Sequence, residues 1–199
     1  MEQTSFIIQR IIDRVNQILG QKTGLSENAF LEFASIFERR ELKRGELFCK
    51  EGQVARYMSY VESGLIRQYY YKKQKDVTEH FTPDGEMFFC IESFFTQQPS
   101  KLVVEALEPS VIQMFSFEKI ENLARRNPEI GILYNNFLKT SLIISQRKAD
   151  SIRYETAHER YDRLLREQPK VVLRAPLQYI ASYLLMTPES LSRIRGGQL

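Results

Sequence analysis

The spacing of hydrophobic residues changes twice along the chain and divides it into three stretches. Residues 6–19 and 27–39 repeat apolar side chains at three- and four-residue intervals, as at Phe30, Phe33 and Phe37, which predicts two helices. From about residue 41 to residue 115, short β-rich runs alternate with turn signals such as KRGE, KEGQ and TPDGE. Regularly spaced short strands are typical of a sandwich or a barrel-like roll. Helical spacing returns from residue 117 onward.

The stretch from Ile130 to Glu155 contains no proline and predicts one long helix. Its apolar residues form a partly heptad-like stripe with two serines within it: Ile130, Leu133, Phe137, Ser141, Ile144, Ser145 and Ile152. Two interpretations remain open, a core helix packed against the roll and a helix that pairs with a second copy of the chain. We favour the dimer helix, because a helix of this length projects beyond a small roll.

The pattern of LQYIASYLLMTPESLSRIR, residues 177–195, predicts two short helices joined by a turn. Thr187 can cap the second helix, and Pro188 fits its first turn. Apolar residues on both helices would lock the crossing, and the small Ala181 lets them approach: Ile180, Leu184, Leu191 and Ile194. The second helix would then turn a polar side outward, with Glu189, Ser190, Ser192 and Arg193. A helical hairpin that only packs against a neighbour remains the alternative.

Composition narrows the class of protein. The chain of 199 residues is 43% hydrophobic, enough to bury a core, and its net charge is +3. From Gln146 onward there are ten Lys and Arg against six Asp and Glu, whereas the rest has eighteen against nineteen. This local positive charge favours a nucleic-acid partner for the C-terminal part. The charged N-terminal stretch fits neither a signal peptide nor a membrane span, so we expect a cytoplasmic protein without membrane contact.

Cysteines and histidines are too few for several kinds of site. We expect Cys49 and Cys90 to be buried, small hydrophobic residues, and they cannot supply four ligands to an iron–sulfur cluster. With only His80 and His158, neither a haem ligand set nor a cupin-like metal enzyme is well supported. We expect His80 to lie half exposed in a strand, with Glu79 on the opposite face. The sequence therefore predicts a protein that is not an enzyme and has no definite cofactor.

The order of four motifs resembles the Crp/Fnr family of bacterial transcription regulators. These motifs are LKRGELFCKEGQ, VESGLIRQYY, TPDGEMFF and IASYLLMTPESLSRIR. The resemblance implies an α+β fold with an effector-sensing β-roll domain and flanking helices in residues 1–125. A long dimerisation helix would follow in residues 126–154, and a helix-turn-helix DNA-binding domain in residues 155–199. It further implies a homodimer on a near-palindromic DNA operator, with RNA polymerase as a further partner.

The resemblance also places candidate site residues. Glu189 and Arg193 fall on base-reading positions, and Ser190 on a position that contacts the backbone or a base. Relatives often have Gly in the turn, where this chain has Leu185, and many add a β-wing after the recognition helix, where residues 196–199 read GGQL. We therefore expect affinity to depend on dimerisation and on additional basic residues. The expected DNA-binding set is Thr187, Glu189, Ser190, Ser192, Arg193, Arg195, Lys170 and Arg174.

In the roll, the resemblance implies a small-molecule effector site. Gly85 and Glu86 match the Gly-Glu pair that holds a ribose hydroxyl, although an ordinary turn explains them as well. The Arg-Ser/Thr pair that binds a cyclic phosphate is replaced by Ser100 and Lys101, and lysine lacks the planar two-pronged geometry of arginine. We therefore expect an effector other than cyclic AMP, contacted by Gly85, Glu86, Met87, Ser100, Lys101 and Ser145. The alternative function is a cyclic-nucleotide-like sensor that acts through protein partners without binding DNA.

Overall fold

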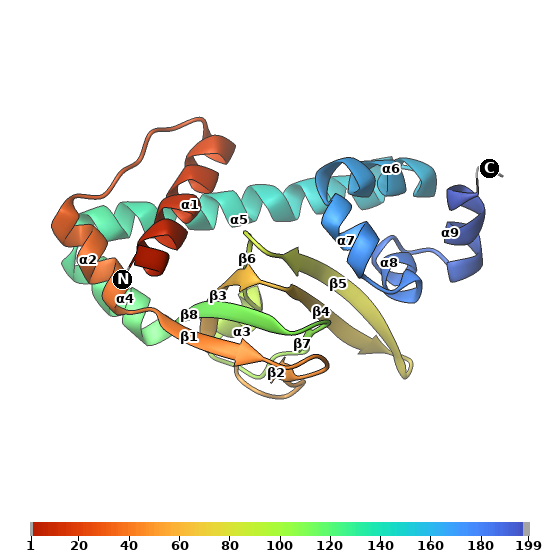
Figure 1. Ribbon diagram of the computed structural model, residues 1–199, viewed down its shortest axis with the longest axis horizontal. Coiled ribbons are helices and arrows are strands. Elements are labelled where there is room, and N and C mark those ends of the chain that lie inside the picture. The colour runs from red at the N-terminus through yellow and green to blue at the C-terminus, as the bar shows by residue number, and fades with distance from the viewer. Residues whose placement is uncertain (1, 197–199) are drawn as a thin grey trace.

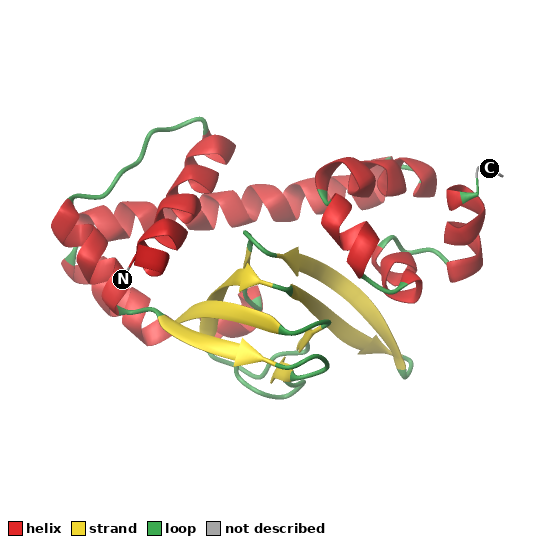
Figure 2. Ribbon diagram, viewed as in Figure 1, coloured by secondary structure: helices red, strands yellow, loops and turns green. Residues whose placement is uncertain are grey.

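The computed structural model describes residues 2–196, which form eight strands and nine helices (Figures 1 and 2). Helices lie at both ends of the chain and β-strands in the middle, so the predicted α+β class is confirmed. The long helix α5 (Pro128–Tyr154) runs past the sheets and joins the N-terminal helices to the C-terminal helices (Figure 1). None of the helices within residues 2–196 is long and apolar enough to cross a membrane.

The strands form two four-stranded antiparallel sheets, with the orders β1-β8-β3-β6 and β2-β7-β4-β5. Together with the short helix α3 (Ile91–Thr96), they are called the roll below. Apolar residues from both sheets fill its interior, including Val61, Ile66, Val104 and Ile112. The strands are β1 (Glu38–Leu42), β2 (Leu47–Cys49), β3 (Tyr57–Ser63), β4 (Leu65–Lys72), β5 (Lys75–Pro83), β6 (Met87–Phe88), β7 (Val103–Ala106) and β8 (Ser110–Ser116).

The turn between β3 and β4 requires a glycine. Gly64 has φ +110°, and a Cβ placed on it would lie 2.7 Å from the Cα of Ser110 in β8. Both the backbone conformation and the close approach exclude larger residues. This glycine is the one in the VESGLIRQYY motif, so the motif marks a tight contact of the β3–β4 turn with β8.

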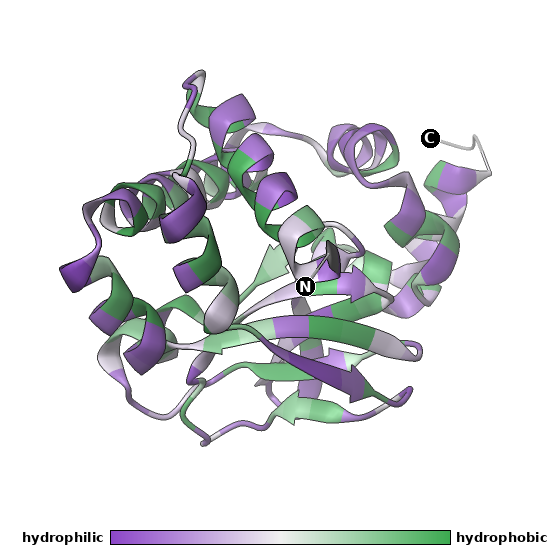
Figure 3. Ribbon diagram, turned by 60° about the vertical axis from the view of Figure 1, so that its left-hand side comes forward, coloured by the Kyte–Doolittle hydropathy of each residue, from purple (hydrophilic) through white to green (hydrophobic). Residues whose placement is uncertain are grey.

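Four helices pack against one end of the roll: α1 (Glu2–Leu19), α2 (Glu27–Ser35), α4 (Phe117–Arg126) and the first half of α5. Side-chain caps define where three of them begin. Ser26 accepts from Ala29 N, Ser116 from Lys119 N, and Asn127 from Glu129 N and Ile130 N. Polar and apolar residues alternate along these helices (Figure 3), as expected when one helix face packs and the other meets solvent.

The long helix has a core half and an exposed half. Ile130 and Leu133 are buried in the core with α1, α2 and α4, and Phe137 packs against that core. These three residues therefore belong to a core face and not to a dimer seam. Farther along the helix, Leu142 is 71% exposed, and Ile144 and Ile152 are also exposed. The second half of α5 thus presents apolar side chains that stay largely exposed within residues 2–196.

The C-terminal unit comprises α6 (Ala157–Glu167), α7 (Pro169–Arg174), α8 (Leu177–Tyr183) and α9 (Pro188–Arg195). A capping box begins α6, in which Thr156 and Glu159 satisfy each other's backbone N–H groups. Leu65 and Phe81 of the roll belong to the same buried cluster as the apolar residues of this unit. The C-terminal unit therefore packs directly on strands β4 and β5 (Figure 1).

Candidate DNA-reading helix pair and effector region

Helices α8 and α9 form the pair that the sequence predicted, and their ends are well defined. The Thr187 hydroxyl caps α9 by accepting from Ser190 N at 3.2 Å, and Pro188 occupies the first helical position. Glu189 lies in the first turn, where its own backbone N–H and then the Thr187 hydroxyl lower the pKa of its carboxyl group. The start of α9 is thus fixed by its own sequence.

The predicted apolar contacts between the two helices are confirmed. Ile180, Ala181 and Leu184 are buried together with Leu191 and Ile194, all at 7% exposure or less. Met186 N donates to Ala181 O at 3.0 Å, which closes the turn. This packing leaves one side of α9 in solvent, with four exposed polar residues: Glu189, Ser192, Arg193 and Arg195. Ser190 is half-buried, and its hydroxyl lies 3.1 Å from the Thr187 hydroxyl.

Lys170 and Arg174 lie elsewhere, on α7, and face the roll. The Arg174 guanidinium pairs with Asp84 at 2.7 Å and also with Glu108, and the Lys170 ammonium pairs with Asp84. The two basic residues are therefore not part of the exposed surface of α9. Asp84 and Glu108 hold them at the contact between the C-terminal unit and the roll.

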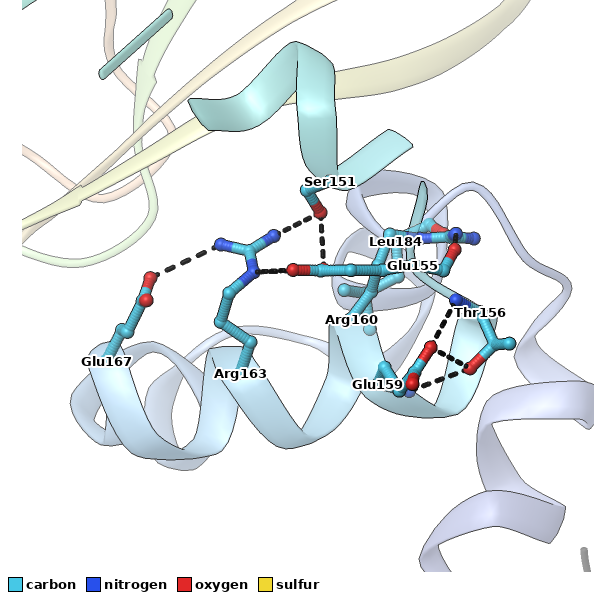
Figure 4. A network of polar contacts seen from close by, with 8 residues as sticks. All are labelled: Ser151, Glu155, Thr156, Glu159, Arg160, Arg163, Glu167 and Leu184. Atoms are coloured by element: carbon cyan, nitrogen blue, oxygen red, sulfur yellow. Dashed lines mark hydrogen bonds and ion pairs between the residues drawn. The ribbon is translucent and has the colours of Figure 1, made fainter. Parts of the chain in front are cut away.

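The junction between α5 and α6 is fixed by a network of polar contacts (Figure 4). The Arg160 guanidinium donates to Leu184 O at 2.9 and 3.1 Å and to Glu155 O at 2.7 Å. Arg163 pairs with Glu155 at 3.0 Å and also donates to Ser151 of α5. These two arginines therefore connect the end of the long helix with the turn that precedes α9.

The Gly85–Glu86 pair forms a tight turn after β5. Gly85 has φ +95°, a conformation that favours glycine, and its N–H donates to Val61 O at 2.9 Å. Burial raises the pKa of the Glu86 carboxyl group, although Arg14 of α1 and Lys170 of α7 act in the opposite direction. Met87 packs against the core beneath α1. Glu86 is thus surrounded by groups from α1 and the C-terminal unit.

Ser100 and Lys101 occupy the region where the resemblance would place a phosphate-binding pair. The Ser100 hydroxyl accepts from Leu102 N at 2.9 Å and is buried, whereas Lys101 is exposed. Cys49 and Cys90, both buried as expected, lie in the apolar cluster inside the roll. Gln68 donates its amide to Phe89 O at 3.2 Å beside Cys90. These side chains fill the roll interior. The Ser100 hydroxyl makes its hydrogen bond within its own turn.

A hollow of about 180 Å³ lies instead between α3 and α5. Ser145 lines it, but Glu86, Ser100 and Lys101 do not, so the structure does not bring the predicted effector residues into one cavity. The other lining residues are apolar, apart from a serine that donates to its own helix: Phe89, Ile91, Phe95, Leu138, Ser141 and Leu142. The apolar stripe predicted from the sequence did not include Leu138 and Leu142. Together with Ser145 and Ile152, these two residues follow a heptad spacing, which could have been recognised in the sequence.

Comparisons with known proteins agree with this architecture. The profile of the cyclic nucleotide-binding domain family matches residues 39–127. No curated protein matches the chain in sequence. Among solved structures, FixK2 from Bradyrhizobium japonicum superposes with a TM-score of 0.69 at 19% identity, covering 81% of this chain and 84% of that chain.

Two further solved structures share the fold. A transcriptional regulator assigned to the crp/fnr family, from Eubacterium rectale, has a TM-score of 0.64 at 17% identity, covering 87% of this chain and 84% of that one. The c-di-GMP-responsive global regulator CLP of Xanthomonas campestris has a TM-score of 0.60 at 16% identity, covering 86% and 91%. The match to the cyclic nucleotide-binding domain family therefore covers the roll and α4. The chain as a whole has the Crp/Fnr fold, as the resemblance in its sequence implied.

Proposed function

We propose that the protein is a homodimeric transcription regulator that binds DNA sequence-specifically and responds to a small-molecule effector. The observation that carries the proposal is the exposed side of α9, with Glu189, Ser192, Arg193 and Arg195. A helix in the major groove can read guanine with arginine and cytosine with glutamate. The capped start of α9, with Thr187 and Ser190, suits a phosphate group.

Dimerisation is supported by the second half of α5. Leu138, Leu142, Ser145, Ala149 and Ile152 recur at alternating intervals of four and three residues along one side of the helix. This is the spacing of a two-stranded coiled-coil seam. Two chains paired along α5 would present two copies of α9, which suits a near-palindromic operator. In this proposal the dimer on DNA also contacts RNA polymerase. In this assignment residues 1–125 sense the effector, residues 126–154 form the dimer contact, and residues 155–199 bind DNA. We place the protein in the cytoplasm. Residues 197–199 lie outside the described part of the chain.

The effector is not cyclic AMP in this proposal. A cyclic phosphate needs a charge-assisted, two-pronged partner, and the corresponding positions carry Ser100, which serves a local turn, and the exposed Lys101. The hollow between α3 and α5 has no charged residue in its lining. An uncharged small molecule fits such a lining better than a nucleotide.

The test compares two substitutions that remove the same charge. Arg193→Ala alters the exposed side of α9, and Arg126→Ala removes an exposed arginine at the end of α4. On a duplex recovered by selection from random sequence, we expect Arg193→Ala to weaken binding by about 1–3 kcal/mol per half-site. Arg126→Ala should bind as the parent protein does. Equal binding by all three proteins, measured by fluorescence anisotropy, would mean that α9 does not read the duplex. Recovery of no duplex in the selection would favour a sensor that acts through protein partners.

A further inference from the structure

Arg67 of β4 is an unusual residue because its charged side chain lies inside the protein. It is 1% exposed. The guanidinium donates to the Thr78 hydroxyl at 2.9 Å, pairs with Asp76, and lies 3.7 Å from the Glu105 carboxylate. A buried cation is costly unless such partners compensate for lost hydration, so its position calls for an explanation beyond packing.

The guanidinium lies between two tyrosine rings that come from different parts of the chain. Its carbon is 4.3 Å from the ring centre of Tyr69, on the same strand, and 3.5 Å from that of Tyr179 in α8. Arginine stacks favourably on aromatic faces, and the attraction grows when water is excluded. The roll thus supplies the cation and one ring, and the C-terminal unit supplies the second ring.

Hydrogen bonds extend this contact along the edge of the sheet. The Thr78 hydroxyl that accepts from Arg67 also accepts from the Ser182 hydroxyl of α8 at 2.8 Å. The backbone N–H of Thr78 donates to Ser182 Oγ at 3.1 Å. Because β5 is the last strand of its sheet, α8 covers this edge and provides a partner for one of its backbone groups. The rings of Phe81 and Tyr183, 5.4 Å apart, continue the same contact.

We propose that Arg67 is a positioning residue for DNA reading. Its stacked guanidinium fixes α8 on the edge of the roll, so that α9 projects from the molecule in one orientation (Figure 1). This inference rests on the proposed DNA-binding function, and it adds that the sensor domain itself sets the direction of the recognition helix. In a dimer, the two copies of α9 would then keep a fixed separation, and the protein would discriminate sharply between half-site spacings.

The test removes one ring at a time from the same guanidinium. Tyr179→Leu removes the ring supplied by α8, and the matched control Tyr69→Leu removes the ring supplied by the roll. Residue-resolved hydrogen exchange of the Thr78 amide reports opening of the contact, because its acceptor is on α8. The Ile112 amide in the roll interior reports general loosening, so the measured quantity is the exchange rate of Thr78 relative to that of Ile112.

We expect Tyr179→Leu to raise this relative rate at least tenfold, Tyr69→Leu to change it less than twofold, and Tyr179→Phe, which keeps the ring, to match the parent protein. An unchanged rate in Tyr179→Leu, or an equal rise in Tyr69→Leu, would overturn the inference. If Tyr179→Leu does not fold, Tyr179→Met is measured by the same criteria.

DNA binding supplies the second arm of the test. Affinity is measured for a selected duplex and for the same duplex with one base pair inserted between its half-sites. The first affinity divided by the second measures discrimination between spacings, and we expect Tyr179→Leu to reduce this ratio about tenfold. Tyr69→Leu should keep the ratio of the parent protein, and a ratio unchanged in Tyr179→Leu would contradict the positioning role. If the parent protein binds no DNA, the proposed function fails, while hydrogen exchange still decides whether Arg67 holds α8 in place.

Discussion

Single residues with unusual surroundings mark the places where the C-terminal helices meet the rest of the chain. Leu185, in the turn before α9, has φ +56°, and its side chain is 52% exposed. A leucine is strained in this conformation. The sequence pointed to this position, because a leucine stands where similar proteins often have glycine. It could not indicate that Arg67 is buried, because the ring that covers it comes from Tyr179, 112 positions later.

The strain at Leu185 leads to a test by two substitutions. Leu185→Gly and Leu185→Ala remove nearly the same exposed side chain, but only glycine adopts a positive φ without strain. We expect the glycine variant to be more stable than the alanine variant by about 1 kcal/mol, the reverse of the usual order in a helix. Urea unfolding of both proteins measures the difference. A glycine variant less stable than the alanine variant would show that the turn is not strained.

His80 provides a prediction about pH. Burial, and then the Lys148 ammonium group, lower its pKa to about 4, whereas the nearby Glu79 carboxylate acts in the opposite direction. The unfolded chain therefore binds a proton at His80 as the pH falls through 6.5, whereas the folded protein does so only near pH 4. The free energy of unfolding should then decrease as the pH falls between these values.

The substitution His80→Gln removes this titration. Between pH 7 and pH 5, we expect the parent protein to lose about 1 kcal/mol more stability than the variant does; the side chain is 36% exposed, so solvent reduces the full effect. Denaturant unfolding at the two pH values gives both losses. Equal losses in the two proteins would mean that His80 titrates normally in the folded state.

At the scale of elements, the sequence predicted best the helices and strands that are long enough to show a repeating pattern of apolar residues. Strands β3, β4, β5, β7 and β8 coincide with β-rich runs in the stretch from about residue 41 to residue 115, and helices α1, α5, α8 and α9 lie where apolar spacing predicted helices. The helix predicted for residues 27–39 was too long: α2 ends at Ser35 and β1, ERREL, begins at Glu38. Strand β1 buries only Leu42 and so shows no alternation, whereas β2 and β6, with three and two residues, are too short to show one. Pro169 follows the end of α6 and begins α7, because proline fits the first turn of a helix.

The expected position of Glu79 was wrong because strand β5 contains a bulge. Gln68 pairs with His80 and Tyr69 with Thr78, which leaves Glu79 as the extra residue. The bulge places the Glu79 carboxylate 2.7 Å from Lys148 Nζ and 3.8 Å from His80 Nε2. Simple alternation would put neighbouring residues on opposite faces, and a bulge has no signal in a single sequence.

The second half of α5 carries the prediction for dimerisation. Leu142→Asp places a charge in the proposed seam, whereas Ile132→Asp makes a similar change at another exposed site on the same helix. Because a dimer contains the Leu142 change twice, its free energy of association should become less favourable by about 3 kcal/mol or more. This corresponds to a hundredfold or greater loss of dimer affinity. Analytical ultracentrifugation should therefore show dissociation for Leu142→Asp and dimers for Ile132→Asp. Dimers of unchanged stability in both variants would place the interface elsewhere.

At the scale of the whole molecule, the order of elements could be predicted from the sequence, but the contacts between distant elements could not. The motifs in order gave the roll, the long helix and the helix pair. The position of Lys170 and Arg174 against Asp84 and Glu108 follows only from the packing of α7 on the roll. The effector residues, chosen by resemblance, are likewise distributed over several environments, because apolar side chains fill the roll interior.

The most direct test of a two-fold DNA reader is selection of bound duplexes from a random-sequence library with the full-length protein. The account predicts enrichment of one half-site in two inverted copies, with centres about 10 base pairs apart, bound by two chains per duplex. Recovery of no enriched sequence, or of a single unrepeated site bound by one chain, would contradict it.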